Sequence, residues 1–517
     1  MTSPRAITVA GAVSGRAEER AGVRLNVFRG IPFAEPPLRF RAPEPVRPWA
    51  GTREAGAFGP AAPQLPLTPI GLPAAAMDAG PTDEAGCLTL NVWSPEAARG
   101  RPVMVWFHGG SFMAGSASMP SYDGATIAAE HDVVVVSANY RVGALGFAPV
   151  EGQANVGLLD QLLALTWVRD NVEAFGGDPA SVTAFGESAG GGSILHLVGA
   201  PACRGLVHRA IVQSGATELT IGADVAGEVA DRLRSALDGD PSAAPVEAIL
   251  AAQPGIVADL AATRQVMAFH PTVDGTLVRG APPETLGEVA SGGVDLLIGT
   301  TADEMTPFLD PAAWELGAER LARRAARYLA TRGVDGSAAE AVLAAYGGGT
   351  PSQAWAALRT DVEMWFPMVA AAEGHAAGAR DAAGPQDAAG PQDAAGRRGR
   401  TFVYRFDWPA APPHARLGAC HGIDIPFTFG TLDRCGWGEF VGADADATSL
   451  SRTVRGAWAA FATSGDPSTD AAGPWPAYDL RTRTTMALGR RVGLVHDPSG
   501  DRRRAWAAAR REPYTSC

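Results

Sequence analysis

One pentapeptide constrains the fold of this chain more than any other segment. Gly186-Glu187-Ser188-Ala189-Gly190 directly follows the apolar run 182–185, and a helix-prone stretch comes after it. A strand that enters Gly-x-Ser-x-Gly and leaves as a helix places the serine on a sharp turn, with its hydroxyl exposed above a sheet. We expect the outer glycines to be required, because a side chain there would collide with the neighbouring strand or helix. With 62 glycines in 517 residues, chance supplies roughly 0.4 such matches, so a simple glycine–serine turn is an equal alternative at this point.

Apolar runs and helical spacings alternate along most of the chain. The runs 103–107 and 133–137 are continuous, which suits strands buried on both faces of a sheet. Gly157 to Phe175 has the apolar spacing of a helix. Residues 7–13 and 23–28 are predicted to form an opening hairpin, and further strands are expected at 87–93, 182–185, 210–213, 296–299 and 402–406. This alternation predicts an α/β layer architecture.

Three segments do not fit the alternation. Residues 222–265 and 311–380 are rich in alanine and arginine, and we expect them to be helical insertions lying over the sheet. Residues 381–400 repeat Asp-Ala-Ala-Gly-Pro-Gln and cannot bury a core, which predicts a disordered, low-complexity surface loop. Because large α/β enzymes can be this long, we expect a single domain across residues 1–517.

Composition excludes several classes of function. A net charge of −12 disfavours nucleic acids and anionic membranes as partners. The five scattered cysteines have neither zinc-ligand spacing nor a disulfide framework, so no metal is expected. All 43 basic residues are arginine, which indicates a high-GC genome, and we expect a bacterial source. We also expect no signal peptide and no membrane-spanning helix.

A serine hydroxyl becomes a useful nucleophile only with a base, a carboxylate that orients the base, and donors for the oxyanion. His108-Gly109-Gly110-Ser111 follows the strand 103–107 and is the candidate for these donors, since glycines let backbone N–H groups approach a substrate closely. His108 itself is interpreted as structural. The alternative reading of this segment is a simple glycine turn.

The base and the acid are harder to choose from the residues alone. In hydrolases whose serine lies on such a strand-to-helix turn, the acid and then the histidine base follow the serine along the chain. His421 stands late in the chain and is the candidate base, and His414 is its main rival. The acid is expected between the serine and the histidine, after a strand, where Asp303 and Glu304 are adjacent. Nothing local decides between these two carboxylates.

At this point the chain resembles the type-B carboxylesterases of the α/β-hydrolase fold, the family of cholinesterases, liver carboxylesterases and bacterial para-nitrobenzyl esterases. The resemblance covers nearly the whole chain in order. It rests on Phe28-Arg29-Gly30-Ile31-Pro32-Phe33-Ala34, Cys87-Leu88-Thr89-Leu90-Asn91-Val92, His108-Gly109-Gly110, Asn139-Tyr140-Arg141, Asn155-Val156-Gly157-Leu158-Leu159-Asp160-Gln161, Phe175-Gly176-Gly177-Asp178-Pro179, the serine pentapeptide, Gln213-Ser214-Gly215, Gly465-Asp466-Pro467 and Trp475-Pro476-Ala477-Tyr478.

The resemblance implies a central, mostly parallel sheet flanked by helices, with helical insertions over the active site. It implies a serine esterase that cleaves carboxylic esters through an acyl-enzyme, without a metal or an organic cofactor. By similarity the catalytic triad is Ser188, Glu304 and His421. The resemblance also implies an oxyanion hole formed by backbone N–H groups of Gly109, Gly110 and Ala189, with Ser111 completing the glycine turn.

The chain departs from the family pattern at three positions. Met305 stands where the family often has a glycine after the acid, and Ser111 replaces a usual glycine or alanine in the oxyanion turn. The cysteine that pairs with the Cys87 position in animal members has no counterpart nearby, which is compatible with a cytoplasmic protein.

Other readings of the same residues stay open. The chemistry would also serve a carbamate, an amide or acyl transfer in secondary metabolism, because specificity lies in the pocket. A binding module on this fold is a further alternative. We expect a small-molecule ester as substrate and a monomer or small homo-oligomer. Candidate pocket walls are Phe112, Met113, Phe308, Trp365, Phe366, Phe427 and Phe429.

Overall fold

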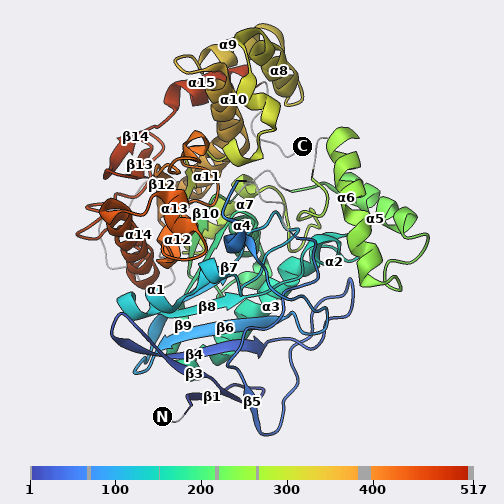
Figure 1. Ribbon diagram of the computed structural model, residues 1–517, viewed down its shortest axis with the longest axis vertical. Coiled ribbons are helices and arrows are strands. Elements are labelled where there is room, and N and C mark those ends of the chain that lie inside the picture. Colours follow the sequence, from blue (N-terminus) through green and yellow to red (C-terminus); the bar gives the residue numbers. More distant parts are fainter. Residues whose placement is uncertain are drawn as a thin grey trace.

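A single large sheet organises the described part of the molecule. The computed structural model describes residues 3–66, 71–150, 152–215, 220–263, 267–381 and 398–510. Within them, eleven strands pair in the order β14-β13-β12-β11-β10-β9-β7-β8-β6-β4-β3 (Figure 1). Their bounds are β3 (Arg16–Arg20), β4 (Val23–Pro32), β6 (Thr89–Pro95), β7 (Arg101–Phe107), β8 (Val134–Ala138), β9 (Gly177–Glu187), β10 (Arg209–Gln213), β11 (Asp295–Thr301), β12 (Thr401–Phe406), β13 (Thr484–Leu488) and β14 (Val492–His496).

The centre of this sheet is parallel and its two ends are antiparallel. All pairings from β8 through β7, β9, β10, β11 and β12 to β13 are parallel. The strands β6, β4 and β3 at one end, and β14 at the other, run antiparallel to their neighbours. The carboxyl ends of the parallel strands therefore meet along one edge, where loops can gather side chains from distant parts of the chain.

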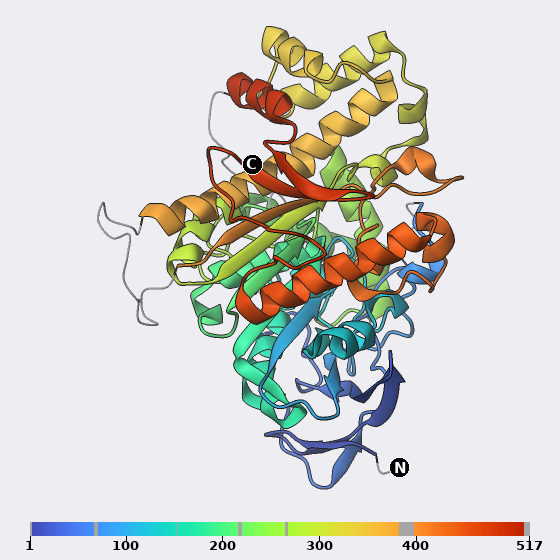
Figure 2. The same ribbon diagram turned by 90° about the vertical axis from the view of Figure 1, so that its left-hand side faces the viewer.

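Both faces of the sheet are covered, which explains the continuous apolar runs. In β7, Val103, Val105 and Phe107 enter one core, while Met104 and Trp106 enter the other. The first core includes residues of α3 (Val156–Asn171), α4 (Ala189–Gly199), α7 (Pro282–Ser291) and α11 (Phe366–Asp381). The second includes residues of α1 (Ala125–His131), α12 (Ile425–Phe429), α13 (Trp437–Val441) and α14 (Ala445–Ser464), the last lying along the face turned to the viewer in Figure 2.

The apolar runs predicted the central strands and α3 correctly, but the opening hairpin was wrong. Residues 7–13 are not one strand: β1 (Arg5–Ile7) and β2 (Ala12–Ser14) pair with each other, and β2 also pairs with β5 (Thr52–Glu54) in a separate small sheet. The partner of β4 is β3, because the turn after Arg20 folds this segment back directly onto β4.

The helical segments take two places in the fold. Helices α5 (Ala223–Ala236) and α6 (Val246–Thr263) form a hairpin at one side of the molecule, and α8 (Ala318–Ala330), α9 (Gly336–Ala344), α10 (Pro351–Thr360) and α15 (Gly500–Ala509) gather at another end (Figure 1). Helix α11 packs on α7, β11 and β12. The range 311–380, which was expected to be an insertion over the sheet, therefore contributes one helix to the layer that covers the sheet directly. Of the described helices, α6 alone is long and apolar enough to cross a bilayer by length and composition, a test that core helices of many soluble proteins also pass.

Two predictions on organisation lie beyond these observations. The loop expected at 381–400 falls, apart from its two ends, on residues 382–397, which are outside the described residues. The single-domain organisation stays a prediction.

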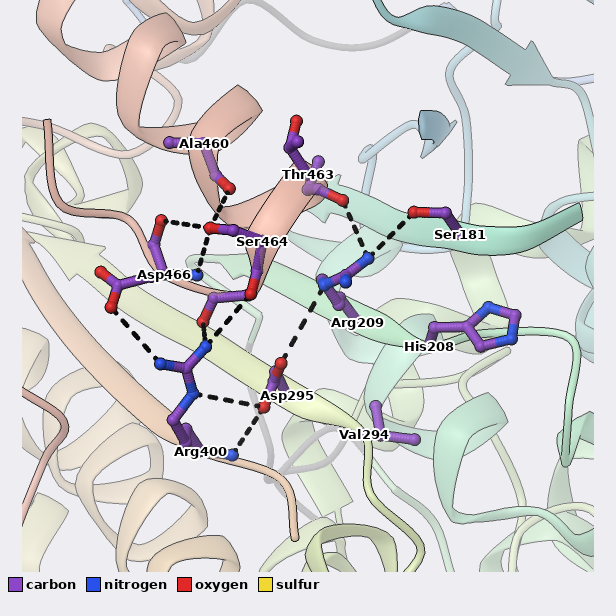
Figure 3. Close-up of polar contacts among 12 residues, drawn as sticks. Ser181, His208, Arg209, Val294, Asp295, Arg400, Ala460, Thr463, Ser464 and Asp466 are labelled. Carbon is purple, nitrogen blue, oxygen red and sulfur yellow. Dashed lines mark hydrogen bonds and ion pairs between the residues drawn. The ribbon is translucent and has the colours of Figure 1, made fainter. Parts of the chain in front are cut away.

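A buried ion network joins the amino ends of the central strands, at the edge opposite the serine turn. Asp295, which is 0% exposed, lies between Arg209 of β10 and Arg400 before β12, at 4.0 and 3.8 Å (Figure 3). The backbone N–H of Arg400 donates to Asp295 at 2.8 Å, and its guanidinium also pairs with Asp466. Because a buried carboxylate is costly without partners, these ion pairs and the backbone N–H bond offset the burial of Asp295.

Candidate active site

Ser188 lies on a strained turn between β9 and α4. Its φ of 55° and ψ of −124° belong to a region that residues other than glycine rarely occupy. Its backbone N–H donates to Gln213 of β10 at 2.9 Å, and its carbonyl accepts from Gly192 at 2.9 Å. These bonds hold the turn from both sides, so the strand-to-helix geometry predicted from the pentapeptide is present.

The outer glycines of the turn sit against the neighbouring strand. A Cβ on Gly186 would lie 2.7 Å from the carbonyl oxygen of Phe107 and 2.8 Å from the carbonyl carbon of Gly190. A Cβ on Gly190 would overlap the same Phe107 oxygen. Backbone atoms cannot move aside as a flexible side chain can, and therefore both positions require glycine.

Glu304 and His421 are brought together from loops 117 residues apart. The Nδ1–H of His421 donates to Glu304 Oε2 at 2.5 Å. The other carboxylate oxygen accepts from the hydroxyl of Ser214 at 2.5 Å and from the backbone N–H of Thr301 at 2.7 Å. Glu304 is 0% exposed and is held at both oxygens, so it fixes the orientation of the imidazole.

The second imidazole nitrogen faces another carboxylate. His421 Nε2 lies 3.1 Å from Oε1 of Glu187, the residue just before the serine. Within the described residues Ser188 Oγ makes no hydrogen bond to His421, although both side chains line the same cavity. Such bonds commonly tighten only when substrate binds.

Burial and neighbouring charges both shift the pKa values of the titratable groups in this cluster. Burial lowers the pKa of His421, but the charges of Glu187 and Glu304 outweigh burial and raise that pKa from 6.5 to about 9. Burial raises the pKa of Glu187 to about 8, and His421 opposes this shift. Burial also raises the pKa of Asp424 to about 6. Because His421 and Glu187 are in contact, they share protons and titrate as a pair.

The rival residues have other surroundings. Asp303 accepts the backbone N–H of Ala419 at 2.8 Å and donates its own N–H to the Ala419 carbonyl at 2.9 Å, so it clamps the acid loop to the histidine loop. His414 packs on Phe440, with ring centroids 5.1 Å apart. The structure thus brings Glu304, not Asp303, against His421.

The glycine turn after β7 lies directly beside the serine. Gly109, Gly110 and Ser111 line the cavity together with Ser188, and a Cβ on Gly109 would lie 3.0 Å from the Cβ of Ser188. Ala189, 0% exposed, is the first residue of α4. The backbone of these residues is therefore within reach of an oxygen bound at Ser188.

His108 packs under this turn. Its ring stacks on Tyr140 at 4.3 Å and its Nδ1 contacts the Gly109 carbonyl at 2.8 Å. Burial lowers the pKa of His108 to about 4, which keeps the ring neutral. This agrees with the structural interpretation of His108.

The cavity at Ser188 is small and mostly apolar, at about 120 Å³. Among the expected walls only Phe308 lines it, with its ring 5.4 Å from that of His421. Phe427 and Phe429 belong to the buried core instead, and Phe112 packs on Phe147. The other apolar walls are Leu72, Met77, Met119, Tyr122 and Ile425. A larger, shallower groove of about 590 Å³ beside α5 and α6 contains none of the candidate residues.

Glu187, Ser214 and the apolar walls other than Phe308 were not predicted from the sequence as parts of the site. Glu187 and Ser214 were visible only as members of motifs, since nothing local shows that their side chains turn toward His421. The apolar walls come from loops that meet only in the folded chain. Among the described residues, no group of His, Cys, Asp and Glu is arranged to hold a metal ion.

Comparisons with known proteins identify the family of this chain. The sequence profile of the carboxylesterase family matches residues 2–503. The chain belongs to the carboxylesterase family. The para-nitrobenzyl esterase of Bacillus subtilis (strain 168) is 35% identical over 97% of this chain and 98% of its own length. The phenmedipham hydrolase of Pseudarthrobacter oxydans is 36% identical over 95% of this chain and 96% of its own.

Solved structures extend the likeness to the fold. A thermophilic para-nitrobenzyl esterase superimposes with a TM-score of 0.80 at 34% identity, covering 98% of this chain and all of the other. The carboxylesterase Est55 of Geobacillus stearothermophilus gives a TM-score of 0.80 at 33% identity, covering 97% and 99%. This carboxylesterase therefore has the α/β-hydrolase fold expected from the sequence.

Proposed function

We propose that this carboxylesterase hydrolyses small carboxylic esters with Ser188 as nucleophile, His421 as base and Glu304 as the acid that orients it. The observation that carries the proposal is the bond from His421 Nδ1 to the fully buried Glu304, in a cavity that also contains Ser188. A buried carboxylate on Nδ1 leaves Nε2 as the basic nitrogen and favours the imidazolium that forms during reaction.

The reaction begins when Ser188 Oγ attacks the ester carbonyl carbon and His421 Nε2 takes the hydroxyl proton. The carbonyl oxygen becomes an oxyanion, which the backbone N–H groups of Gly109, Gly110 and Ala189 stabilise. The C–O bond to the alcohol then breaks, and the alcohol oxygen leaves with the proton from His421. The acyl group stays bound to Ser188 Oγ.

Water completes the cycle. It attacks the acyl carbon and gives one proton to His421 Nε2, and the second tetrahedral intermediate releases the carboxylic acid. The proton on His421 returns to Ser188 Oγ. No step calls for a group outside the chain, the ester and water.

The size and polarity of the cavity favour a short, uncharged group next to Ser188. A volume of about 120 Å³ is well below that of pockets which enclose drug-sized ligands, roughly 300–1,000 Å³. Phe308, which is 39% exposed, stands beside His421 at this cavity. Larger parts of a substrate would extend past Phe308 toward solvent.

The test is turnover of a short-chain p-nitrophenyl ester by the wild type, Ser188→Ala and Ser235→Ala, which changes an exposed serine on α5. We expect Ser188→Ala to lose about 10⁴-fold or more in kcat, whereas Ser235→Ala keeps wild-type kinetics. Intact mass after treatment with a fluorophosphonate should show one adduct in the wild type and in Ser235→Ala, and none in Ser188→Ala. Turnover by Ser188→Ala, or an adduct on it, contradicts the assignment.

A further inference from the structure

The turn that carries the proposed oxyanion donors is itself strained. Ser111 and Phe112 are consecutive non-glycine residues with φ values of 54° and 58°. Left-handed backbone costs roughly 1–2 kcal/mol for each such residue. Strain of this kind persists only where the surroundings hold the backbone in place.

The short helix α2 (Gly143–Phe147) contacts the turn at Phe112 through a hydrogen bond and a ring contact. The Gly143 N–H donates to the carbonyl of Phe112 at 2.6 Å. The ring of Phe112 packs edge-on against that of Phe147, with centroids 4.9 Å apart. Any displacement at the start of α2 is thereby passed to Phe112 and to the adjacent donors.

The start of α2 is in turn held by one side chain from outside it. The preceding residue, Val142, offers no side-chain cap, and the N–H of Ala144 donates to Oε1 of Gln253 at 2.8 Å. Helix-start N–H groups need such partners when they are buried. A Cβ on Gly143 would overlap the same Oε1, which shows how closely the amide of Gln253 is pressed against this backbone.

Gln253 is unusual for its helix. The buried residues of α6 are Ile249, Gln253, Ile256 and Leu260, and the glutamine is 1% exposed. Burying an amide on an otherwise apolar face costs free energy unless it is hydrogen-bonded, so packing alone does not account for it. Helices α5 and α6 form a hairpin at the side of the molecule (Figure 1), and α6 contacts α2. The amide of Gln253 lies in this contact.

We propose that Gln253 is a positioning residue for the oxyanion hole, acting through Ala144, Gly143 and Phe112. This inference rests on the proposed ester hydrolysis. The amide holds the start of α2, α2 holds the strained turn, and the turn aims the N–H groups of Gly109 and Gly110. Loss of the Gln253 acceptor should therefore weaken stabilisation of the tetrahedral intermediate more than binding of the ester.

The test compares three variants with the wild type. Gln253→Met keeps the length of the side chain and removes the acceptor, and Gln253→Glu retains an acceptor oxygen. Ile256→Ala is the matched control, because it removes buried apolar packing one turn away on the same helix and leaves the Gln253 acceptor in place. The measurements are kcat and KM for p-nitrophenyl acetate, the inhibition constant of a trifluoromethyl ketone whose oxyanion adduct mimics the intermediate, and Tm.

For Gln253→Met we expect kcat to fall about 10- to 100-fold while KM stays within about twofold, since misplacement of a preorganised donor costs less than its removal. The trifluoromethyl ketone should bind more weakly by the same factor as the loss in kcat/KM. Gln253→Glu should recover most of this loss. Ile256→Ala should lower Tm and keep kcat near that of the wild type.

Amide hydrogen exchange of the segment 109–114 gives a readout independent of turnover. The inference predicts faster exchange there in Gln253→Met than in Ile256→Ala. Unchanged kcat, inhibitor binding or exchange in Gln253→Met overturns it, as does an equal loss of kcat in Ile256→Ala. A wild type that neither hydrolyses esters nor labels at Ser188 overturns the proposed function instead, and the exchange measurement then still decides the role of Gln253.

Discussion

Replacing Glu187 by glutamine tests how the site controls its base. The substitution keeps the size of the side chain and removes one negative charge 3.1 Å from His421 Nε2. Catalysis requires neutral His421, and the charge of Glu187 favours the protonated form. We therefore expect Glu187→Gln to lower the pKa of His421, so that the acidic limb of the pH–activity profile moves to lower pH.

The structure bounds the size of this shift. Two unit charges at 3.1 Å interact by about 1.3 kcal/mol in water and by about 5 kcal/mol at an effective dielectric constant of 20. These energies correspond to roughly one and four pKa units. The side chains of His421 and Glu187 are only 12% and 4% exposed, so the water value is a lower bound. A shift of about one to two units is expected, because Glu304 and Asp424 continue to raise the pKa of His421.

Glu187 is not the sole charge that faces His421. Glu304 bonds its Nδ1, and Asp424 also raises the pKa of His421. Both stay in place in Glu187→Gln, so the pKa of His421 should fall without dropping below its ordinary value of about 6.5. The relative activity on the acidic side should rise accordingly.

The assay is kcat/KM for p-nitrophenyl acetate between about pH 5 and pH 10, the range over which the base titrates. The product is followed at its isosbestic wavelength, so that ionisation of the phenol does not distort the rates. Glu96→Gln is the matched control, because Glu96 lies in an exposed ion pair with Arg24. Its profile should coincide with that of the wild type.

An acidic limb that stays in place would refute the electrostatic reasoning. It would mean that Glu187 is already protonated when His421 titrates, which is the direction in which burial pushes the pKa of Glu187. A limb that moves to higher pH would show that the Glu187 charge does not stabilise the imidazolium at all.

Two further substitutions test the supports of the site. Asp303→Ala removes the acceptor of the Ala419 N–H, and because the loop that carries His421 then loses alignment, steady-state kinetics should show kcat reduced about tenfold. Asp303→Asn keeps an acceptor oxygen and should recover most of this loss. Equal kcat in the two variants would contradict the role of Asp303 as a clamp. Asp295→Asn should lower the free energy of unfolding in urea by about 3 kcal/mol, the lower end for a broken buried ion pair, because Arg400 is 38% exposed. The kcat of Asp295→Asn should stay that of the wild type, since the ion pairs of Asp295 lie at the ends of the strands opposite the active site. An unchanged urea midpoint would show that these ion pairs add no net stability.

Sequence patterns predicted the central part of the fold well, because a parallel strand buried on both faces is a continuous apolar run in the sequence. The runs at 103–107 and 133–137 became β7 and β8, and the helical spacing at 157–175 became α3 with a further 3₁₀ turn. The edges were predicted less well. Residues 7–13 were predicted as one strand, although the chain turns between β1 and β2, where Thr8 and Gly11 exchange backbone hydrogen bonds. The strands β13 and β14 were not predicted.

Parts of the candidate site were likewise predictable from the sequence, and other parts were not. The serine turn and the glycine turn depend on residues that are neighbours in sequence, so their positions were predictable. Between Asp303 and Glu304 the residues alone could not decide, and resemblance to the family favoured Glu304. The folded chain separates the two by contact: Glu304 bonds His421, and Asp303 bonds the backbone of Ala419.

The sequence by itself predicted that Ser188 sits on a strand-to-helix turn, because the pentapeptide and the apolar run before it favour that geometry and a glycine turn, an acid and a histidine accompany them in the expected order. Only the tertiary structure decided what surrounds the serine. Glu187, Ser214 and Gln253 acquire their contacts with His421, Glu304 and α2 through packing between distant segments. The physical reason is that the parallel sheet aligns strand ends from separate parts of the chain, and no local pattern records which side chains then face one another.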